Sequence, residues 1–275
     1  MSSSSRIPPL LEPYLTLPPE ASLILLTSVL GASANWLVLR HVYSYLRGED
    51  RDTGVVLVSF LRDGAFWRDG AAKMASLVFC VYATAVWGLI VLQGLDLDAL
   101  ARAGLFVFVD GLTGLVAGDA PPGSRKERVI RGSKLPDVKK ELEAAVADLG
   151  TTRKVLIVDQ LDALLAITDE TTTSLALQNL LLSLRSLVHS GVVTMAADTP
   201  LAGAQTTTLE REHASLVLST AHAADAVAAL RMLDTGSARD VSGVVRLTGP
   251  GVGEPGEFLY HVAADGGVRV FERGA

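Results

Sequence analysis

Cysteine is almost absent from this chain, and its scarcity excludes an internal disulfide framework. Among 275 residues there is a single cysteine, Cys80, so no intrachain disulfide can form. Residues 1–6 are followed by prolines rather than by the apolar core of a secretion signal. We therefore expect a protein of the cytoplasm and the nucleus.

Histidines that could bind a metal together are also lacking, and the chain has no overall excess of positive charge. The five histidines, His41, His189, His213, His222 and His261, share no spacing that sets two on one face toward a metal. We therefore expect no metal site and no cofactor. With 24 basic and 30 acidic residues the net charge is −6, so the molecule as a whole is not a polyanion binder. Any contact with nucleic acid must come from a local patch.

One long apolar run stands out. Residues 74–93 contain no charge, and a run of about 20 apolar residues is long enough to cross a bilayer. Its flanks, Lys73 before it and Asp96 after it, are those of ordinary soluble proteins, and no second span exists. A single-pass membrane anchor therefore stays only as an alternative.

Buried strands and helices alternate along most of the chain. Continuous apolar runs predict strands at residues 22–27, 54–60, 105–109, 155–158 and 192–196, as in parallel sheets covered on both faces. Helices are expected from Asn35 onward, at 137–149 with Asp137 as N-cap, and at 175–189, where the pattern is apolar almost all round and predicts burial. Residues 209–233 are ambiguous between helix and strand.

The C-terminal part has a different pattern. Strands with alternating polarity are predicted at 244–247, 258–262 and 268–273, and the last two are joined by a hairpin signal. The sequence thus predicts an α/β fold, a mainly parallel sheet with helices on both faces and an antiparallel C-terminal edge. Residues 1–20, with five prolines, should form an arm packed over a single domain at 21–275.

The stretch 21–45 predicts a strand, a tight loop and a helix, which is the unit that holds phosphates in P-loop proteins. A working loop has the pattern G-x-x-x-x-G-K-[S/T]. Here Ser28 and Ser33 occupy the glycine positions, Ala34 replaces the lysine and Asn35 replaces the hydroxyl, with Gly31 between them. We therefore interpret this segment as a degenerate phosphate loop.

Two carboxylates follow predicted strands. Asp159 ends the run Val-Leu-Ile-Val-Asp, which has the form of a Walker B strand, whose aspartate would hold magnesium through water. The alternative is that Asp159 and Asp162 cap the turn after the strand, and the missing lysine favours it. Asp110 has the same two interpretations, because sites of α/β proteins lie at carboxyl ends of strands.

Positive charge gathers in one segment. Residues 124–140 carry a local excess of five positive charges. The first five of these cations are Arg125, Lys126, Arg128, Arg131 and Lys134. Such a basic, glycine-flanked loop can bind RNA by charge and shape, and a solvated surface loop is the alternative.

Several blocks resemble a known family. The runs LGASANW at 30–36, LRDGAFW at 61–67, FVFVDGLTGL at 106–115 and LIVDQLDALLA at 156–166 are similar to the sixth subunit of the Elongator complex. The resemblance extends from about residue 10 to residue 274. It implies a RecA-like (P-loop NTPase-like) fold without a working Walker A motif. It also implies a hetero-hexameric ring with the fourth and fifth Elongator subunits, which binds tRNA and supports wobble-uridine (U34) modification without being an enzyme.

The resemblance also favours RNA contact by the basic segment, which would face the channel of such a ring. It breaks at residues 74–93, because residues 70–73 should join 94–100 directly. Our hypothesis is that these residues are a retained intron or a gene-model error. A nucleotide-hydrolysing enzyme acting alone is the remaining alternative.

Overall fold

The computed structural model describes residues 6–47, 52–74, 94–116, 127–168, 172–234 and 238–272, and the backbone of 76–77 and 91–92. Arg125 and Lys126 of the predicted RNA-binding segment lie outside these described residues, as do most of residues 74–93.

The described strands form a ten-stranded sheet in the order β12-β11-β10-β9-β1-β8-β7-β2-β5-β6. The strands from β9 to β6 pair in parallel, and β9 to β12 pair antiparallel. The fold class predicted from the sequence is confirmed. The strands are β1 Ser22–Ser28, β2 Thr53–Ser59, β5 Phe106–Asp110, β6 Arg128–Val129, β7 Arg153–Asp159, β8 Ser190–Ala196, β9 Ala226–Arg231, β10 Gly243–Thr248, β11 Gly256–Val262 and β12 Val268–Phe271.

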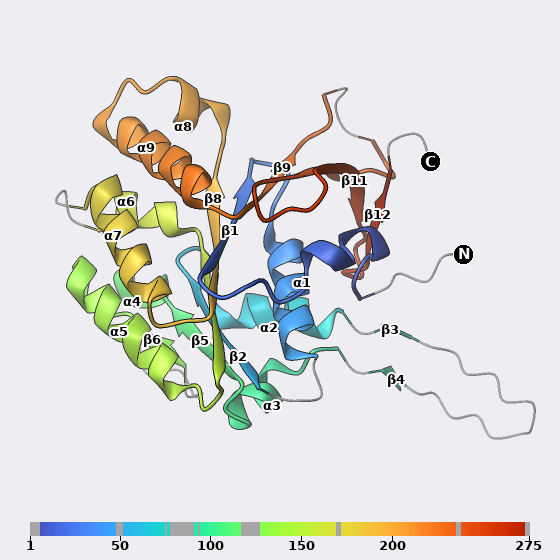
Figure 1. Cartoon of the computed structure of the whole chain (residues 1–275), viewed down its shortest axis with the longest axis horizontal. Coiled ribbons are helices and arrows are strands. Elements are labelled where there is room, and N and C mark those ends of the chain that lie inside the picture. Colours follow the sequence, from blue (N-terminus) through green and yellow to red (C-terminus); the bar gives the residue numbers. More distant parts are fainter. Residues whose placement is uncertain are drawn as a thin grey trace, which may run out of the picture.

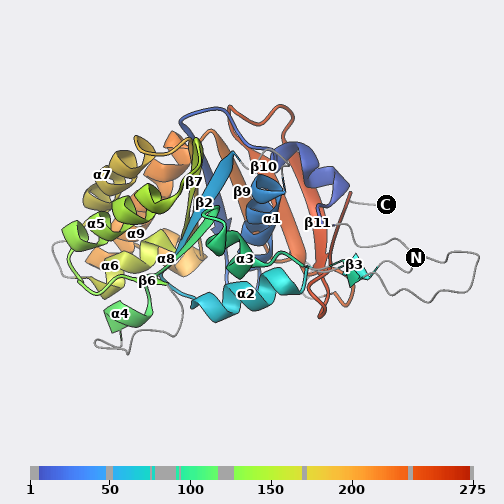
Figure 2. The same cartoon turned by 90° about the horizontal axis from the view of Figure 1, so that it is seen from below.

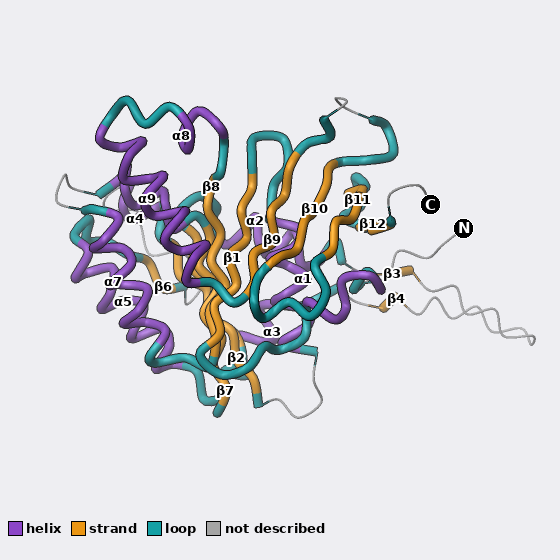
Figure 3. Tube along the Cα trace, turned by 45° about the horizontal axis from the view of Figure 1, so that its top comes forward, coloured by secondary structure: helices purple, strands orange, loops and turns teal. Residues whose placement is uncertain are grey.

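Helices cover both faces of this sheet (Figures 1 and 2). One face carries the 3-10 helix η1 Pro9–Tyr14 and the helices α1 Asn35–Leu46, α2 Gly64–Ala72 and α3 Leu97–Arg102. The other carries α5 Leu135–Asp148, α6 Leu164–Ile167, α7 Ser174–Arg185 and α9 Thr208–Ala223. Figure 3 shows the strands between these two groups. The short elements α4 Thr113–Val116, η2 Leu161–Ala163 and α8 Thr199–Gly203 complete the described helices.

Two hydrophobic clusters fill the space between the sheet and its helices. In β1, Ile24 and Leu26 belong to the cluster under α1, whereas Leu23 and Leu25 belong to the cluster under α7 and α9. Successive side chains of a strand point to opposite faces, so a strand covered on both sides must be apolar throughout. This explains why continuous apolar runs in the sequence predicted the parallel strands.

Two helix predictions were wrong in detail. Asp137 is not an N-cap, because α5 begins at Leu135 and Lys134 stands before it. The helix at 175–189 is not buried all round, because Leu175 and Leu182 of α7 are each 64% exposed. The ambiguous segment 209–233 contains both a helix, α9, and a strand, β9.

The two ends of the segment at residues 74–93 lie close together. The backbone segments β3 Ser76–Leu77 and β4 Val91–Leu92 pair antiparallel as a separate small sheet, apart from the main sheet in Figure 1. The amide of Leu95 donates to the carbonyl oxygen of Ala71 over 3.1 Å, and a Cβ on Gly94 would collide with the backbone of Ala72. Within the described ranges, no helix is long and apolar enough to cross a membrane.

Deleting residues 75–93 and joining Met74 to Gly94 should therefore leave the domain folded. The contacts of Gly94 and Leu95 with Ala72 and Ala71 hold the two ends together and remain after the deletion, and shortening a loop changes the closure entropy little. We expect the same circular-dichroism spectrum and a change in Tm below about 4 °C, which is roughly 1 kcal/mol for a domain of this size. A deletion variant that aggregates, or that lacks a cooperative unfolding transition, would show that the segment is needed for folding.

Helix α1 buries a histidine, His41, that has no charged partner among the described residues. His41 Nδ1 lies 2.9 Å from the Tyr45 hydroxyl. The His41 residue is buried. Burial disfavours the protonated ring and lowers the pKa of His41 to about 3. The ring is therefore neutral in the folded protein at every ordinary pH.

This burial should make the fold acid-sensitive. Below pH 6.5 the unfolded chain takes up a proton at His41 that the folded chain does not, so stability falls as pH decreases from about 6.5 toward 3. The free energy of unfolding should fall by up to ~1.4 kcal/mol for each pH unit in this range. In His41→Phe, urea midpoints measured between pH 7 and pH 4 should depend less steeply on pH. The exposed His222 offers the matched control, and an unchanged slope in His41→Phe would contradict the assignment.

Candidate functional site

Polar side chains gather at the carboxyl ends of the neighbouring strands β1, β8, β7, β2 and β5. They are Ser28, Thr194, Asp159, Ser59 and Asp110, and all are buried. This edge is where ligands bind in open parallel sheets. The structure thus brings the degenerate phosphate loop and the Walker-B-like Asp159 to one edge, with β8 between their strands.

The loop between β1 and α1 is closed on itself. Val29 and Ala32 form an antiparallel bridge, and the amide of Ala32 donates to the carbonyl oxygen of Val29 over 2.9 Å. The amide of Leu30 donates to Asp198 Oδ1 over 2.8 Å. A phosphate loop needs free backbone N–H groups that point at the anion. Here the Leu30 amide is bound to a carboxylate of the same chain.

Gly31 makes this turn possible. Its φ of +91° lies in the left-handed region that favours glycine, and a Cβ there would lie 2.9 Å from Met232 Sδ. The Leu30 side chain is 90% exposed at the tip of the turn. Farther along, Ser33 Oγ accepts from the amide of Asn35 over 3.2 Å, and Ala34, at the lysine position, is buried.

Asp159 is bound by its own fold. Its two carboxylate oxygens accept from Ser59 Oγ over 2.7 Å and from Thr194 Oγ1 over 2.9 Å, so it connects β7 to both neighbouring strands. Burial raises the pKa of Asp159, although the Ser59 hydroxyl opposes this shift. Neither the metal-ligand nor the turn-cap interpretation anticipated these contacts.

The other two carboxylates have structural partners. Asp110 Oδ1 accepts from the amides of Leu112 and Thr113 over 2.9 and 2.7 Å, which is the turn-capping role. Asp162 Oδ2 lies 3.2 Å from His213 Nε2 and accepts from the amide of Ala196 over 3.3 Å. Among the described residues, no group of three metal-binding side chains comes together.

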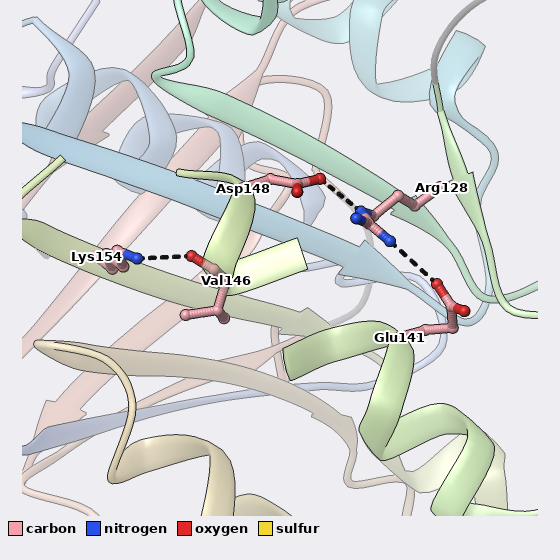
Figure 4. A network of polar contacts seen from close by, with 5 residues as sticks. All are labelled: Arg128, Glu141, Val146, Asp148 and Lys154. Atoms are coloured by element: carbon pink, nitrogen blue, oxygen red, sulfur yellow. Dashed lines mark hydrogen bonds and ion pairs between the residues drawn. The ribbon is translucent and has the colours of Figure 1, made fainter. Parts of the chain in front are cut away.

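Within the basic segment, Arg128 is engaged in a polar network (Figure 4). Its Nε donates to Asp148 over 2.7 Å and its Nη1 to Glu141 over 3.3 Å. The hydrogen bond to Asp148 raises the pKa of Arg128. In the same network Lys154 Nζ donates to the carbonyl oxygen of Val146, near the end of α5, over 2.9 Å. Arg128 therefore ties β6 to α5, and its charge is balanced.

Arg131 and Lys134 are placed differently. Both are exposed after β6, at the carboxyl edge of the sheet, and neither has an ion-pair partner in the part of the chain that is described. Of the five cations predicted to bind RNA, these two are described and free to contact a ligand.

Sequence reasoning missed Asp198, Thr194 and Ser59. Asp198 contacts a loop 168 positions away in the chain, so no local pattern could reveal it. Thr194 had a weak signal, since it is a polar residue inside the apolar run Val-Val-Thr-Met-Ala. A buried hydroxyl in a central strand needs a hydrogen-bond partner, and Asp159 provides it.

Comparison with known proteins supports the fold and goes no further. No family model matches the chain, and no curated protein matches it. Among solved structures, the chain is similar to a KaiC-like protein from the hyperthermophilic archaeon Pyrococcus horikoshii. The TM-score is 0.59 at 13% identity, over 98% of this chain and 99% of that one. The chain therefore has a RecA-like fold.

The substitution Asp159→Asn tests whether this carboxylate has a catalytic role. We expect an unfolding free energy that is unchanged or higher, because the buried charge is removed and the Ser59 and Thr194 hydroxyls can accept as well as donate. We also expect no ATP hydrolysis above background in either protein. Phosphate release by the native chain that disappears in Asp159→Asn would instead support a nucleotide-hydrolysing enzyme.

Proposed function

We propose that this protein is a non-catalytic subunit of the Elongator complex. In this proposal it assembles with the fourth and fifth subunits into a hetero-hexameric ring of RecA-like domains. The ring binds tRNA and supports modification of the wobble uridine, in the cytoplasm and the nucleus. The chain needs no cofactor, and residues 74–93 do not anchor it in a membrane.

One observation carries the non-catalytic part of the proposal. The RecA-like fold keeps the strand–loop–helix unit, yet Ala34 stands at the lysine position and the Leu30 amide is bound to Asp198. Transfer of a phosphoryl group depends on a lysine and on backbone amides that cradle the phosphates. The lysine is absent and one amide of the same loop is occupied, so the loop is poorly suited to hydrolysis, and assembly is the function that we propose.

Exposed apolar side chains support the assembly part. Leu175 and Leu182 lie seven positions apart on α7, and Leu218 on the neighbouring α9 is 60% exposed. Helix α7 carries no charged residue before Arg185. Depletion of charge is typical of the centre of protein interfaces.

Co-purification tests the assembly directly. The chain should co-purify with tagged fourth and fifth subunits, and the native mass should equal that of two copies of each. A chain that stays monomeric in their presence would count against membership of the ring.

Charge reversal tests RNA binding in the assembled ring. Arg131→Glu/Lys134→Glu should weaken tRNA binding about 10-fold or more, because two phosphate contacts are lost. It should also lower the slope of log K against log salt by about 1 for each contact. The readout is fluorescence anisotropy with labelled tRNA over a series of salt concentrations.

Arg246→Glu/Arg269→Glu is the matched control for this test. It makes the same change of charge at exposed positions of β10 and β12, on the antiparallel side of the sheet. If both double variants weaken binding equally, the effect is one of net charge and the basic segment is not the contact.

A further inference from the structure

A small cavity lies beside the loop between β1 and α1, on the side away from Asp159. Its volume is about 270 Å³. On this side β1 is followed by β9, whereas on the other side β8 separates β1 from β7, which ends at Asp159. The antiparallel part of the sheet therefore builds most of the cavity. Its lining includes Gly31, Met232, Ala238, Arg239, Ser242 and His261.

The sheet holds Ser242 and His261 side by side. Ser242 precedes β10 and His261 belongs to β11, and these strands pair antiparallel with Gly243 opposite Tyr260. The amide of Ser242 donates to the carbonyl oxygen of Tyr260 over 2.8 Å, and Ser242 Oγ accepts from the amide of Val262 over 2.9 Å. A hydroxyl group has one donor and two acceptor sites. The Ser242 hydroxyl is thus fixed by its accepted bond and can still donate to a ligand.

The lining of this cavity carries a positive charge that no acidic residue balances. Arg239 is exposed and lines the cavity, and no aspartate or glutamate belongs to the described lining. Asp234 and Glu257 of the same region are both paired with Arg231. Arg239 has no ion-pair partner among the described residues. The cavity therefore suits an anion, in contrast to a lining whose charges cancel.

The size and the donor groups of the cavity favour a compact anion. Its volume lies below the range of about 300–1,000 Å³ that is typical of pockets for drug-sized ligands. His261 is half-buried beside the Ser242 hydroxyl, and its Nδ1 has no hydrogen-bond partner in the described part of the chain. Arginine binds phosphate through two parallel N–H bonds. The further oxygens of a tetrahedral phosphate can then accept from a hydroxyl and an imidazole.

We propose that this cavity binds a phosphate group, carried either by a small molecule or by an RNA backbone. The adjacent loop is poorly suited to this role, because its Leu30 amide is bound to Asp198. The cavity that Gly31 borders instead offers side-chain donors from the loop before β10 and from β11. This inference goes beyond the proposed ring and does not depend on it, since the isolated chain carries the whole cavity.

Titration of the isolated chain with sodium phosphate tests the inference. Sodium chloride keeps the ionic strength constant, and heteronuclear NMR follows the backbone amide signals of Ser242 and His261. We expect saturable shifts of these signals with a dissociation constant in the millimolar range. Shifts that do not saturate, or that are spread evenly over the chain, would show non-specific binding and overturn the inference.

Removal of the cation should weaken binding. Arg239→Gln should raise the dissociation constant for phosphate about 10-fold or more, because a charge-assisted hydrogen bond is lost at an exposed position. Arg211→Gln is the matched control, since Arg211 is exposed on α9 and does not line the cavity. An equal loss in the two variants would reduce the effect to net charge and contradict the site.

A second pair of variants changes the shape of the cavity without changing its charge. Ala238 is exposed and lines the cavity, whereas Ala264 is exposed and does not line it. Ala238→Trp should weaken phosphate binding, because the indole ring occupies space that the ligand needs, and Ala264→Trp should bind as the native chain does. Native affinity in Ala238→Trp would exclude this cavity.

Other ligands identify the class and the source of the anion. Sodium acetate should bind more weakly than phosphate, and equal affinity would assign the cavity to carboxylates and overturn the proposal. Adenosine monophosphate and a short single-stranded RNA are then tested as competitors of inorganic phosphate. Stronger competition by the mononucleotide indicates a small phosphorylated ligand, and stronger competition by the RNA indicates its backbone. If neither competes, inorganic phosphate is an adventitious ion only and the proposal fails.

Discussion

Burial of both faces of the parallel sheet is the constraint on which the rest of the structure depends. The middle of each parallel strand therefore consists of apolar residues. The polar groups lie toward the strand ends. There Asp159 is itself buried and takes hydrogen bonds from Ser59 and Thr194 of the two adjacent strands. A carboxylate in such surroundings must be satisfied within the protein. The edge that could hold a nucleotide is therefore held together by its own side chains.

The loop between β1 and α1 has its shape fixed by packing, independently of any phosphate-binding groups. Its strand and its helix are fixed by packing, since β1 is buried throughout and α1 buries Trp36 and Leu37 against the sheet. Phosphate affinity depends on a few other groups, which can change without loss of the fold. Here the carboxylate of Asp198 binds the Leu30 amide, so the chain itself supplies a negatively charged acceptor.

Most of the fold was readable from the sequence, and much less of the site. Continuous apolar runs and a hairpin signal are local patterns, and they predicted the strands and the antiparallel edge correctly. The contact between Asp198 and Leu30 joins distant parts of the chain, and no local pattern encodes it. Counting charge along the segment treated Arg128 as a free cation, whereas Asp148 and Glu141 balance it after folding. Charge balance across elements depends on tertiary structure, so a local count overestimates the free charge.

Helix α7 also shows that a local sequence pattern cannot predict tertiary contacts, here the burial of a helix face. Its nearly uncharged sequence predicted complete burial, yet Leu175 and Leu182 are exposed in the isolated chain. The sequence signal for a buried helix is the absence of a polar stripe, and it does not tell whether the covering atoms come from the same chain. A subunit that is always assembled can bury such a face against a neighbour. The exposed leucines of α7 are therefore compatible with the proposed ring, in which this face would pack against a neighbouring subunit.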